Sequence, residues 1–207
     1  MTRDERLVRW LTTLLETPGL TALDSFEGAW SILVEEALAA AELVVEGPVV
    51  DVGSGGGSPG IPLATARPEL RFDLLEASRR KCTFLREATH ELPNVRVVCA
   101  RAEEHGRGEG RDAYATALAR ALAPPPVAAE WCLPLVRPGG VAVLYAGRGE
   151  SDDDRLAAAA QELGAGRPEA FVLPGAMGRR LLVLRKLEPT PARFPRRPGI
   201  ARKRPLG

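Results

Sequence analysis

Residues 49–60 read VVDVGSGGGSPG, and residues 61–68 continue as IPLATARP. The apolar start is typical of a strand, the run of glycines is typical of a tight turn, and proline is tolerated in the first turn of a helix. The stretch therefore predicts a strand, a glycine turn and a helix. Such a turn lets a ligand lie against bare backbone, while the helix N-terminus offers unpaired N–H groups and a partial positive charge.

The glycine pattern fits a dinucleotide fingerprint poorly, because Ser58 stands where GxGxxG has its third glycine. Asp51 is the last residue but one of the predicted strand, and a carboxylate there suits a ligand with an ammonium group. S-adenosylmethionine has such a group. The alternative is an ordinary tight turn without a ligand, which the conformational cost of so many glycines disfavours.

Bulk composition indicates a soluble globular protein. The chain has 207 residues, which suits one domain with a small appendage, and it is 45% hydrophobic and 27% charged. No apolar run reaches the ~20 residues of a membrane span, and the first residues lack the apolar core of a signal peptide. We therefore expect a cytoplasmic protein without a membrane partner. The sequence does not determine the oligomeric state, and we expect a monomer.

The cysteines and histidines indicate no metal site. Cys82, Cys99 and Cys132 are far apart and form no CxxC pair. We interpret them as small buried hydrophobic residues, not as a disulfide framework or a zinc site. His90 and His105 share no metal-ligand spacing with them, so no metal is expected.

Basic charge is concentrated at one end of the chain. The formal net charge is only +1, but residues 179–207 contain ten Lys or Arg and one acid, so this end is +9 and the rest is −8. Such a distribution is typical of a surface that binds phosphates, as in nucleic acid. The alternative is a solvated end without a partner.

The hydrophobic pattern predicts the order of helices and strands. An amphipathic helix is expected over residues 3–16 and a second from Asp24 or Ser25 to about Val44, with Trp10, Phe26 and Trp30 as packing residues. Strands and helices then alternate. The expected strands are near 48–52, 70–75, 95–99, 113–118, 139–145, 169–173 and 180–187, and the expected helices are near 60–66, 79–91, 125–135 and 152–163.

The last two apolar runs are separated by a short glycine-containing link, which favours an antiparallel hairpin. The fold class expected is therefore α/β: a Rossmann-like, seven-stranded, mostly parallel sheet with an antiparallel last strand and helices on both faces. This is the class I methyltransferase architecture, whereas a dinucleotide dehydrogenase would continue with a crossover helix. We expect a helical cap at 1–45, a cofactor-binding domain at 46–188 and a basic, extended Pro/Arg-rich tail at 189–207, disordered in the absence of its partner.

Acidic residues follow two of the predicted strands. Glu76 ends the second strand, where a carboxylate can accept both hydroxyls of a ribose; a helix-capping acid is the alternative. Ala102, Glu103 and Glu104 follow the third strand, where an adenine would rest.

Five segments together resemble the RsmG family, also called glucose-inhibited division protein B: DVGSGGGSPGIPLA, LLEASRRKCTFL, ARAEE, ALARALAPP and FPRRPGIARKRPL. The resemblance covers residues 46–207 and is most specific in the tail. It implies an S-adenosylmethionine-dependent methyltransferase that acts on guanine N7 in 16S ribosomal RNA, as naked RNA or as the 30S particle. The family usually has a bulky apolar residue where Ser58 stands and a proline where Ala201 stands, and its usual N-terminal motifs are absent here.

The resemblance implies cofactor contacts from Gly53, Ser58, Ala102, Glu103 and Arg120. With the residues from the patterns above, the expected cofactor-binding set is Asp51, Gly53, Gly55, Ser58, Glu76, Ala102, Glu103 and Arg120. Guanine N7 has an in-plane lone pair and no proton at neutral pH, so no catalytic acid or base is assigned and the rate depends on positioning. Arg120, at the exit of the fourth strand, is the candidate for orienting cofactor or guanine; a surface ion pair is the alternative.

The basic tail is the candidate RNA-binding surface. The residues expected to contact phosphates are Arg193, Arg196, Arg197, Arg202, Lys203 and Arg204. Removal of residues 192–207 is expected to weaken RNA binding and to spare cofactor binding. Two other functions stay open: a small-molecule methyltransferase, which has little use for this tail, and a cofactor-binding RNA or ribosome-assembly protein without turnover.

Overall fold

The computed structural model describes residues 3–147, 153–173 and 179–207. A seven-stranded sheet has the order β3-β2-β1-β4-β5-β7-β6. Strands β1 to β5 run parallel, whereas β7 is antiparallel to both β5 and β6. The strands are β1 Val49–Val52, β2 Phe72–Glu76, β3 Val95–Cys99, β4 Tyr114–Arg120, β5 Val136–Ala146, β6 Glu169–Val172 and β7 Arg180–Arg185. The expected sheet with its antiparallel last strand is confirmed, and the glycine-containing link predicted between β6 and β7 lies outside the described residues.

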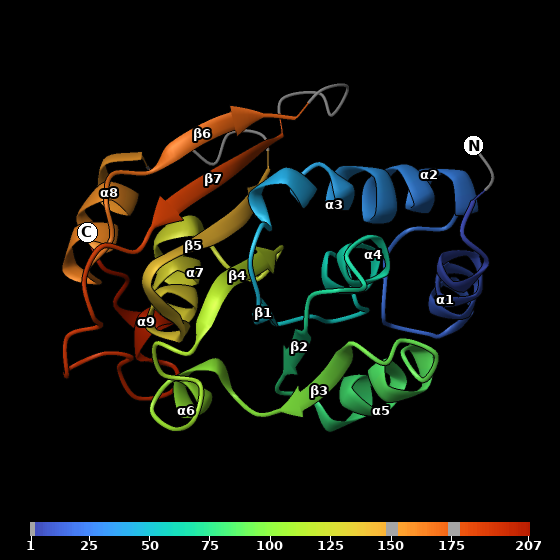
Figure 1. Cartoon of the computed structure of the whole chain (residues 1–207), viewed down its shortest axis with the longest axis horizontal. Coiled ribbons are helices and arrows are strands. Elements are labelled where there is room, and N and C mark those ends of the chain that lie inside the picture. The colour runs from blue at the N-terminus through green and yellow to red at the C-terminus, as the bar shows by residue number, and fades with distance from the viewer. Residues whose placement is uncertain (1–2, 148–152, 174–178) are drawn as a thin grey trace.

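Helices cover both faces of this sheet (Figure 1). The α-helices are α1 Glu5–Glu16, α2 Phe26–Trp30, α3 Glu36–Leu38, α4 Gly60–Ala66, α5 Arg79–Ala88, α6 Ala102–His105, α7 Pro125–Cys132, α8 Asp153–Glu162 and α9 Ile200–Lys203. The second predicted N-terminal helix is interrupted, because a π-helical segment at Ser31–Glu35 joins α2 to α3 and a 3₁₀ turn follows at Ala41–Leu43. A second 3₁₀ turn, Leu133–Leu135, extends α7.

Separate apolar clusters fill the two faces. On one face, side chains of α7 and α8 pack with Phe194, Ala201 and Leu206 of the C-terminal tail. On the other, α1 and α2 pack with Ile61 of α4 and Leu85 of α5. Adjacent strand residues alternate between the faces, so Val50 belongs to the first cluster and Val49 to a third beneath α4. The sheet is therefore covered as its apolar strands require.

The N-terminal helix α1 is amphipathic, as predicted. Its buried side chains are Leu7, Trp10, Leu11 and Leu14. The indole N–H of Trp10 donates a 2.8 Å hydrogen bond to the carbonyl of Gly56, so the helix packs directly on the glycine turn. Trp10 and Trp30 are both buried, which confirms them as packing residues.

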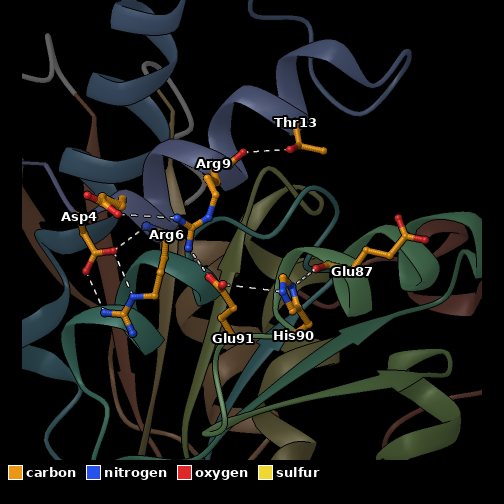
Figure 2. Close-up of polar contacts among 8 residues, drawn as sticks. Asp4, Arg6, Arg9, Thr13, Glu87, His90 and Glu91 are labelled. Atoms are coloured by element: carbon orange, nitrogen blue, oxygen red, sulfur yellow. Dashed lines mark hydrogen bonds and ion pairs between the residues drawn. The ribbon is translucent and has the colours of Figure 1, made fainter.

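An exposed ion pair links α1 to the segment just after α5 (Figure 2). Arg9 contacts the carboxylate of Glu91, which in turn faces His90 Nε2 at 3.9 Å. The carbonyl of Glu87 lies 2.9 Å from His90 Nδ1. Such exposed pairs contribute only about 0–1 kcal/mol each, so the apolar side of α1 supplies most of the attachment.

Two expectations need correction. Cys82 of α5 and Cys99 of β3 form a disulfide with their Cα atoms 5.9 Å apart, so their interpretation as unpaired residues was wrong; only Cys132 is free and buried. The sequence hides this pairing because the turn from α5 into β3 brings together residues 17 positions apart.

The C-terminal tail is irregular apart from α9, but it is not a free extended segment. Phe194, Ala201 and Leu206 are buried in the core. The guanidinium of Arg111 donates to the carbonyls of Phe194 at 2.6 Å and Thr190 at 2.5 Å. The expectation of a disordered tail was wrong because its few apolar side chains pack beside α7, which low periodicity in the sequence does not reveal.

Within the described ranges, no helix combines the length and apolar character that a bilayer span needs. The same residues contain no group of three His, Cys, Asp or Glu side chains that could hold a metal ion.

Candidate active site

A cleft of about 540 Å³ lies at the carboxyl ends of the central parallel strands. Gly53 follows β1, Glu76 ends β2, and Ala102 and Glu103 follow β3 on its wall. Ala121 follows β4 and completes this side of the cleft. The strand order reverses between β1 and β4, where open α/β sheets bind their ligands. The cleft therefore lies where the sequence predicts it.

The glycine turn takes a backbone path that other residues disfavour. Gly53, Gly55 and Gly57 have φ angles of +70°, +57° and +107°. A Cβ on Gly53 would also lie 2.3 Å from the Leu122 side chain on the cleft wall. The turn thus leaves space that a side chain at residue 53 would fill.

Asp51 lies behind this turn and does not line the cleft. Its Oδ2 accepts a 3.0 Å hydrogen bond from the backbone N–H of Gly60 at the start of α4. Burial raises the pKa of this carboxyl to about 7, and the Gly60 N–H opposes that rise. The sequence suggests that Asp51 contacts the ammonium group of a ligand, but its carboxylate faces α4 and not the cleft. Asp51 instead holds the glycine turn against α4.

Glu76 connects the turn to the second strand. Its Oε2 accepts from the N–H of Gly55 at 3.0 Å, and its Oε1 accepts from the N–H of Ser78 at 2.7 Å, just before α5. Glu76 therefore does accept a hydrogen bond at the start of α5, as the helix-capping alternative predicts. Each carboxylate oxygen can accept more than one hydrogen bond, so this residue can still receive ribose hydroxyls from the cleft.

Glu103 is buried and contacts the tail as well as the cleft. Its Oε1 accepts a 3.1 Å hydrogen bond from the N–H of Gly199. Gly199 and Arg202 both line the cleft, and the Arg202 guanidinium lies 5.2 Å from the centre of the Trp131 ring. Trp131, Gly199 and Lys81 also line the cleft and were not predicted from the sequence. Of these, only Lys81 had a local signal, since it lies five residues after Glu76.

Ser58 and Arg120 lie together outside this cleft. Arg120 Nη1 donates to the carbonyl of Ile32 at 2.6 Å and to Ser58 Oγ at 3.1 Å, and Ser58 Oγ donates to the carbonyl of Leu33 at 2.7 Å. Burial lowers the pKa of Arg120. The alternative of a surface ion pair is therefore wrong. Arg120 instead lines a second cavity of about 260 Å³, which shares Ala121 with the cleft.

The six basic tail residues have different surroundings. Arg196 pairs with Glu130, whose side chain is 1% exposed, and its Nε lies 2.7 Å from Glu130 Oε1. Arg193 pairs with Glu162 at 3.3 Å on the surface. Arg197, Lys203 and Arg204 are exposed. Arg196 thus holds the tail to α7, whereas the exposed residues present their charge to solvent.

The sheet order, the antiparallel β7 and the glycine turn define the class I S-adenosylmethionine-dependent methyltransferase fold. Solved structures agree. Fibrillarin of Aeropyrum pernix, in complex with S-adenosylmethionine, has a TM-score of 0.56 at 16% identity, covering 71% of this chain and 73% of its own. RsmC of T. thermophilus, a 16S rRNA N2 methyltransferase in complex with AdoMet and guanosine, has a TM-score of 0.53 at 19% identity, covering 74% of this chain and 40% of its own.

The family model described as GidB, rRNA small subunit methyltransferase G, matches residues 3–180. The enzyme of that name from Rubrobacter xylanophilus is 44% identical over 199 residues, which cover 91% of this chain and 74% of the relative. The one from Synechococcus sp. strain JA-3-3Ab is 42% identical over 165 residues, covering 76% of this chain and 64% of the relative. The chain belongs to the rRNA small subunit methyltransferase G family, which confirms the resemblance. It spans 64% of the length of both Synechococcus relatives that it matches.

Proposed function

We propose that this chain transfers the methyl group of S-adenosylmethionine to N7 of a guanine in 16S ribosomal RNA, as naked RNA or within the 30S particle. Family membership supports the reaction and the substrate. The observation that carries the proposal is the cleft, where the bare turn at Gly53 faces the Glu76 carboxylate across the ends of β1 and β2. As a ribosomal RNA enzyme it would work in the cytoplasm, and we expect a monomer.

The residues of the cleft fit this cofactor. Glu76 has acceptor capacity for the ribose hydroxyls, and Ala102 and Glu103 offer a wall for the adenine. The left-handed glycines at 53 and 55 leave the backbone open for the methionine portion. Asp51 supports the turn from behind through Gly60. When bound, the cofactor supplies an electrophilic methyl group on a sulfonium.

The task of the protein is then positioning. Guanine N7 needs no deprotonation, so no residue has to act as a general base. Holding two reactants at contact distance and in line can lower a barrier by up to about 7–11 kcal/mol. Arg120, in the wall of the second cavity next to Ala121, is suited to orient the acceptor because the Ile32 carbonyl and the Ser58 hydroxyl fix its Nη1.

The exposed basic residues of the tail support an RNA substrate over a small molecule. Arg202 lines the cleft and Arg197, Lys203 and Arg204 are exposed nearby in sequence, so phosphate contacts would form at the mouth of the site.

Transfer of labelled methyl from S-adenosylmethionine tests the proposal. The acceptors are 16S RNA and 30S particles from cells that lack this methylation, and nucleoside mass identifies the product. We expect label on 7-methylguanosine and none on RNA transcribed with 7-deazaguanosine. Cofactor binding without transfer to either acceptor would contradict the proposal and favour an assembly protein without turnover.

A further inference from the structure

The second cavity lies beside the cleft and is built from several separate parts of the chain. Ile32 and Glu36 come from the interrupted N-terminal helix, Arg120 and Ala121 from the end of β4, Tyr145 from β5, and Arg179 from just before β7. Ala121 borders both spaces and has a φ of +49°, a conformation that is uncommon outside glycine and often marks functional sites. A π-helical segment, also frequent at such sites, supplies Ile32.

The polar groups of this cavity have capacity for a ligand. The Glu36 side chain is 14% exposed, and its Oε1 accepts from Arg179 Nη1. Among the described residues, the hydrogen bonds of these two side chains use Glu36 Oε1 and Arg120 Nη1, which leaves Glu36 Oε2 and the Nε and Nη2 of Arg120 for a ligand. The Tyr145 hydroxyl donates to the carbonyl of Ala37 at 2.6 Å and can still accept. None of the Glu36 and Arg120 atoms left for a ligand is among the buried polar atoms that lack a partner in the described part of the chain, so they are open to solvent in the cavity, where a polar ligand can replace water as their partner.

The pair formed by Arg179 and Glu36 complements one nucleobase edge. The Watson–Crick edge of guanine presents the O6 acceptor, then the N1–H donor, then the N2 amino donor. A guanidinium beside a carboxylate presents a donor followed by two acceptors, in the matching order. Adenine would place its N1 lone pair against the carboxylate, and pyrimidines would leave one acceptor unmatched. Enzymes that modify a base commonly read this edge after the base has left its stack.

We propose that this cavity holds the acceptor guanine, with Glu36 receiving its N1–H and N2 amino group and Arg179 donating to O6. The inference rests on the proposed function, because it assumes that a cofactor in the cleft gives its methyl group to a base in the second cavity, past Ala121, which borders both spaces. Glu36 is then a residue that determines base specificity, and Arg120 lies at the boundary between the two reactants.

The test compares Glu36→Gln with the wild type on 16S RNA carrying either guanine or inosine at the methylated position. Inosine keeps O6, N1–H and N7 but lacks the N2 amino group. We expect the wild type to prefer guanine about 10- to 100-fold in kcat/KM, since the carboxylate would lose one partner. We expect Glu36→Gln to methylate guanine about 100-fold less well and to lose most of the preference.

Two further variants separate base recognition from a purely structural ion pair. Glu35→Gln changes the neighbouring exposed glutamate and should match the wild type in rate and preference. Arg179→Gln should slow transfer to guanine and inosine alike, because both bases have O6. Cofactor affinity should stay within about twofold in all three variants, which shows that each one folds.

The proposal is overturned by a wild type that methylates guanine and inosine equally well, or by a Glu36→Gln variant that keeps the full preference. A wild type that transfers no methyl to any RNA would instead refute the proposed function itself, so the two failures are distinguishable.

Discussion

The backbone N–H of Gly199 donates a 3.1 Å hydrogen bond to the Glu103 carboxylate, although 96 residues separate them in sequence. This contact places the C-terminal tail on the wall of the cleft, and Arg202 follows within α9. The expectation that removal of residues 192–207 spares cofactor binding therefore does not fit the geometry. Without the tail, the cleft would lose a wall and the core would lose Phe194, Ala201 and Leu206.

Arg202→Ala should weaken cofactor binding severalfold. The substitution removes a cleft residue and its cation–π contact with Trp131, which is worth about 0.5–2 kcal/mol. Isothermal titration with S-adenosylmethionine measures the change. Lys203→Ala is the matched control, since Lys203 is exposed and absent from the cleft wall. Equal cofactor affinities in both variants would show that the tail only borders the site.

Arg196→Ala should lower the free energy of unfolding by about 3–5 kcal/mol, because it leaves the Glu130 carboxylate buried without its cation. Arg197→Ala, one residue on and exposed, should change stability by no more than about 0.5 kcal/mol while weakening RNA binding. Urea denaturation and RNA affinity at two salt concentrations separate the effects. A stable Arg196→Ala variant with weakened RNA binding would favour a direct phosphate contact instead.

Gly53→Ala should reduce cofactor affinity at least about tenfold. The left-handed φ of +70° costs a non-glycine residue about 1–2 kcal/mol, and the new Cβ would meet Leu122 in the cleft. Gly139→Ala is the control, since its φ of +83° imposes similar strain in open space. Gly53→Ala should lose at least as much stability as Gly139→Ala because of the added contact with Leu122, but only Gly53→Ala should lose cofactor affinity. If the two bind the cofactor alike, the turn does not contact it.

Asp51→Asn should reduce the pH dependence of stability. The pKa of Asp51 is raised from 3.8 to about 7, so the folded state retains a proton that the unfolded chain releases above about pH 4. The protonated Asp51 carboxyl therefore contributes fully to the free energy of unfolding below pH 4, and this contribution is lost as the pH rises through 7. Asparagine does not titrate and keeps an oxygen for the Gly60 N–H.

Urea denaturation at pH 5 and pH 8 measures this effect. Between pH 5 and pH 8, the free energy of unfolding of the wild type should fall by about 2 kcal/mol more than that of Asp51→Asn, because of the raised pKa of Asp51. Parallel pH profiles for the two proteins would mean that Asp51 is ionised in the folded state at pH 5.

Local signals in the sequence predicted the fold and named Gly53, Glu76, Ala102 and Glu103, which line the cleft. The strands, the glycine turn and Glu76 at a strand end follow from periodicity and turn chemistry over a few neighbouring residues. The contacts of Arg120 with Ile32, of Arg196 with Glu130 and of Cys82 with Cys99 were not predictable in the same way. Each joins elements that only the packed sheet brings together, and Arg196 has the same local sequence context as its exposed neighbour Arg197.

The most direct test of the central claim is nucleoside mass analysis of 16S ribosomal RNA from cells that lack the family enzyme and express this chain. We expect 7-methylguanosine to return with the wild-type chain and to be lost with Gly53→Ala produced at the same level. A normal level of wild-type protein without 7-methylguanosine in the 16S RNA would contradict the assignment of this chain as a guanine N7 methyltransferase.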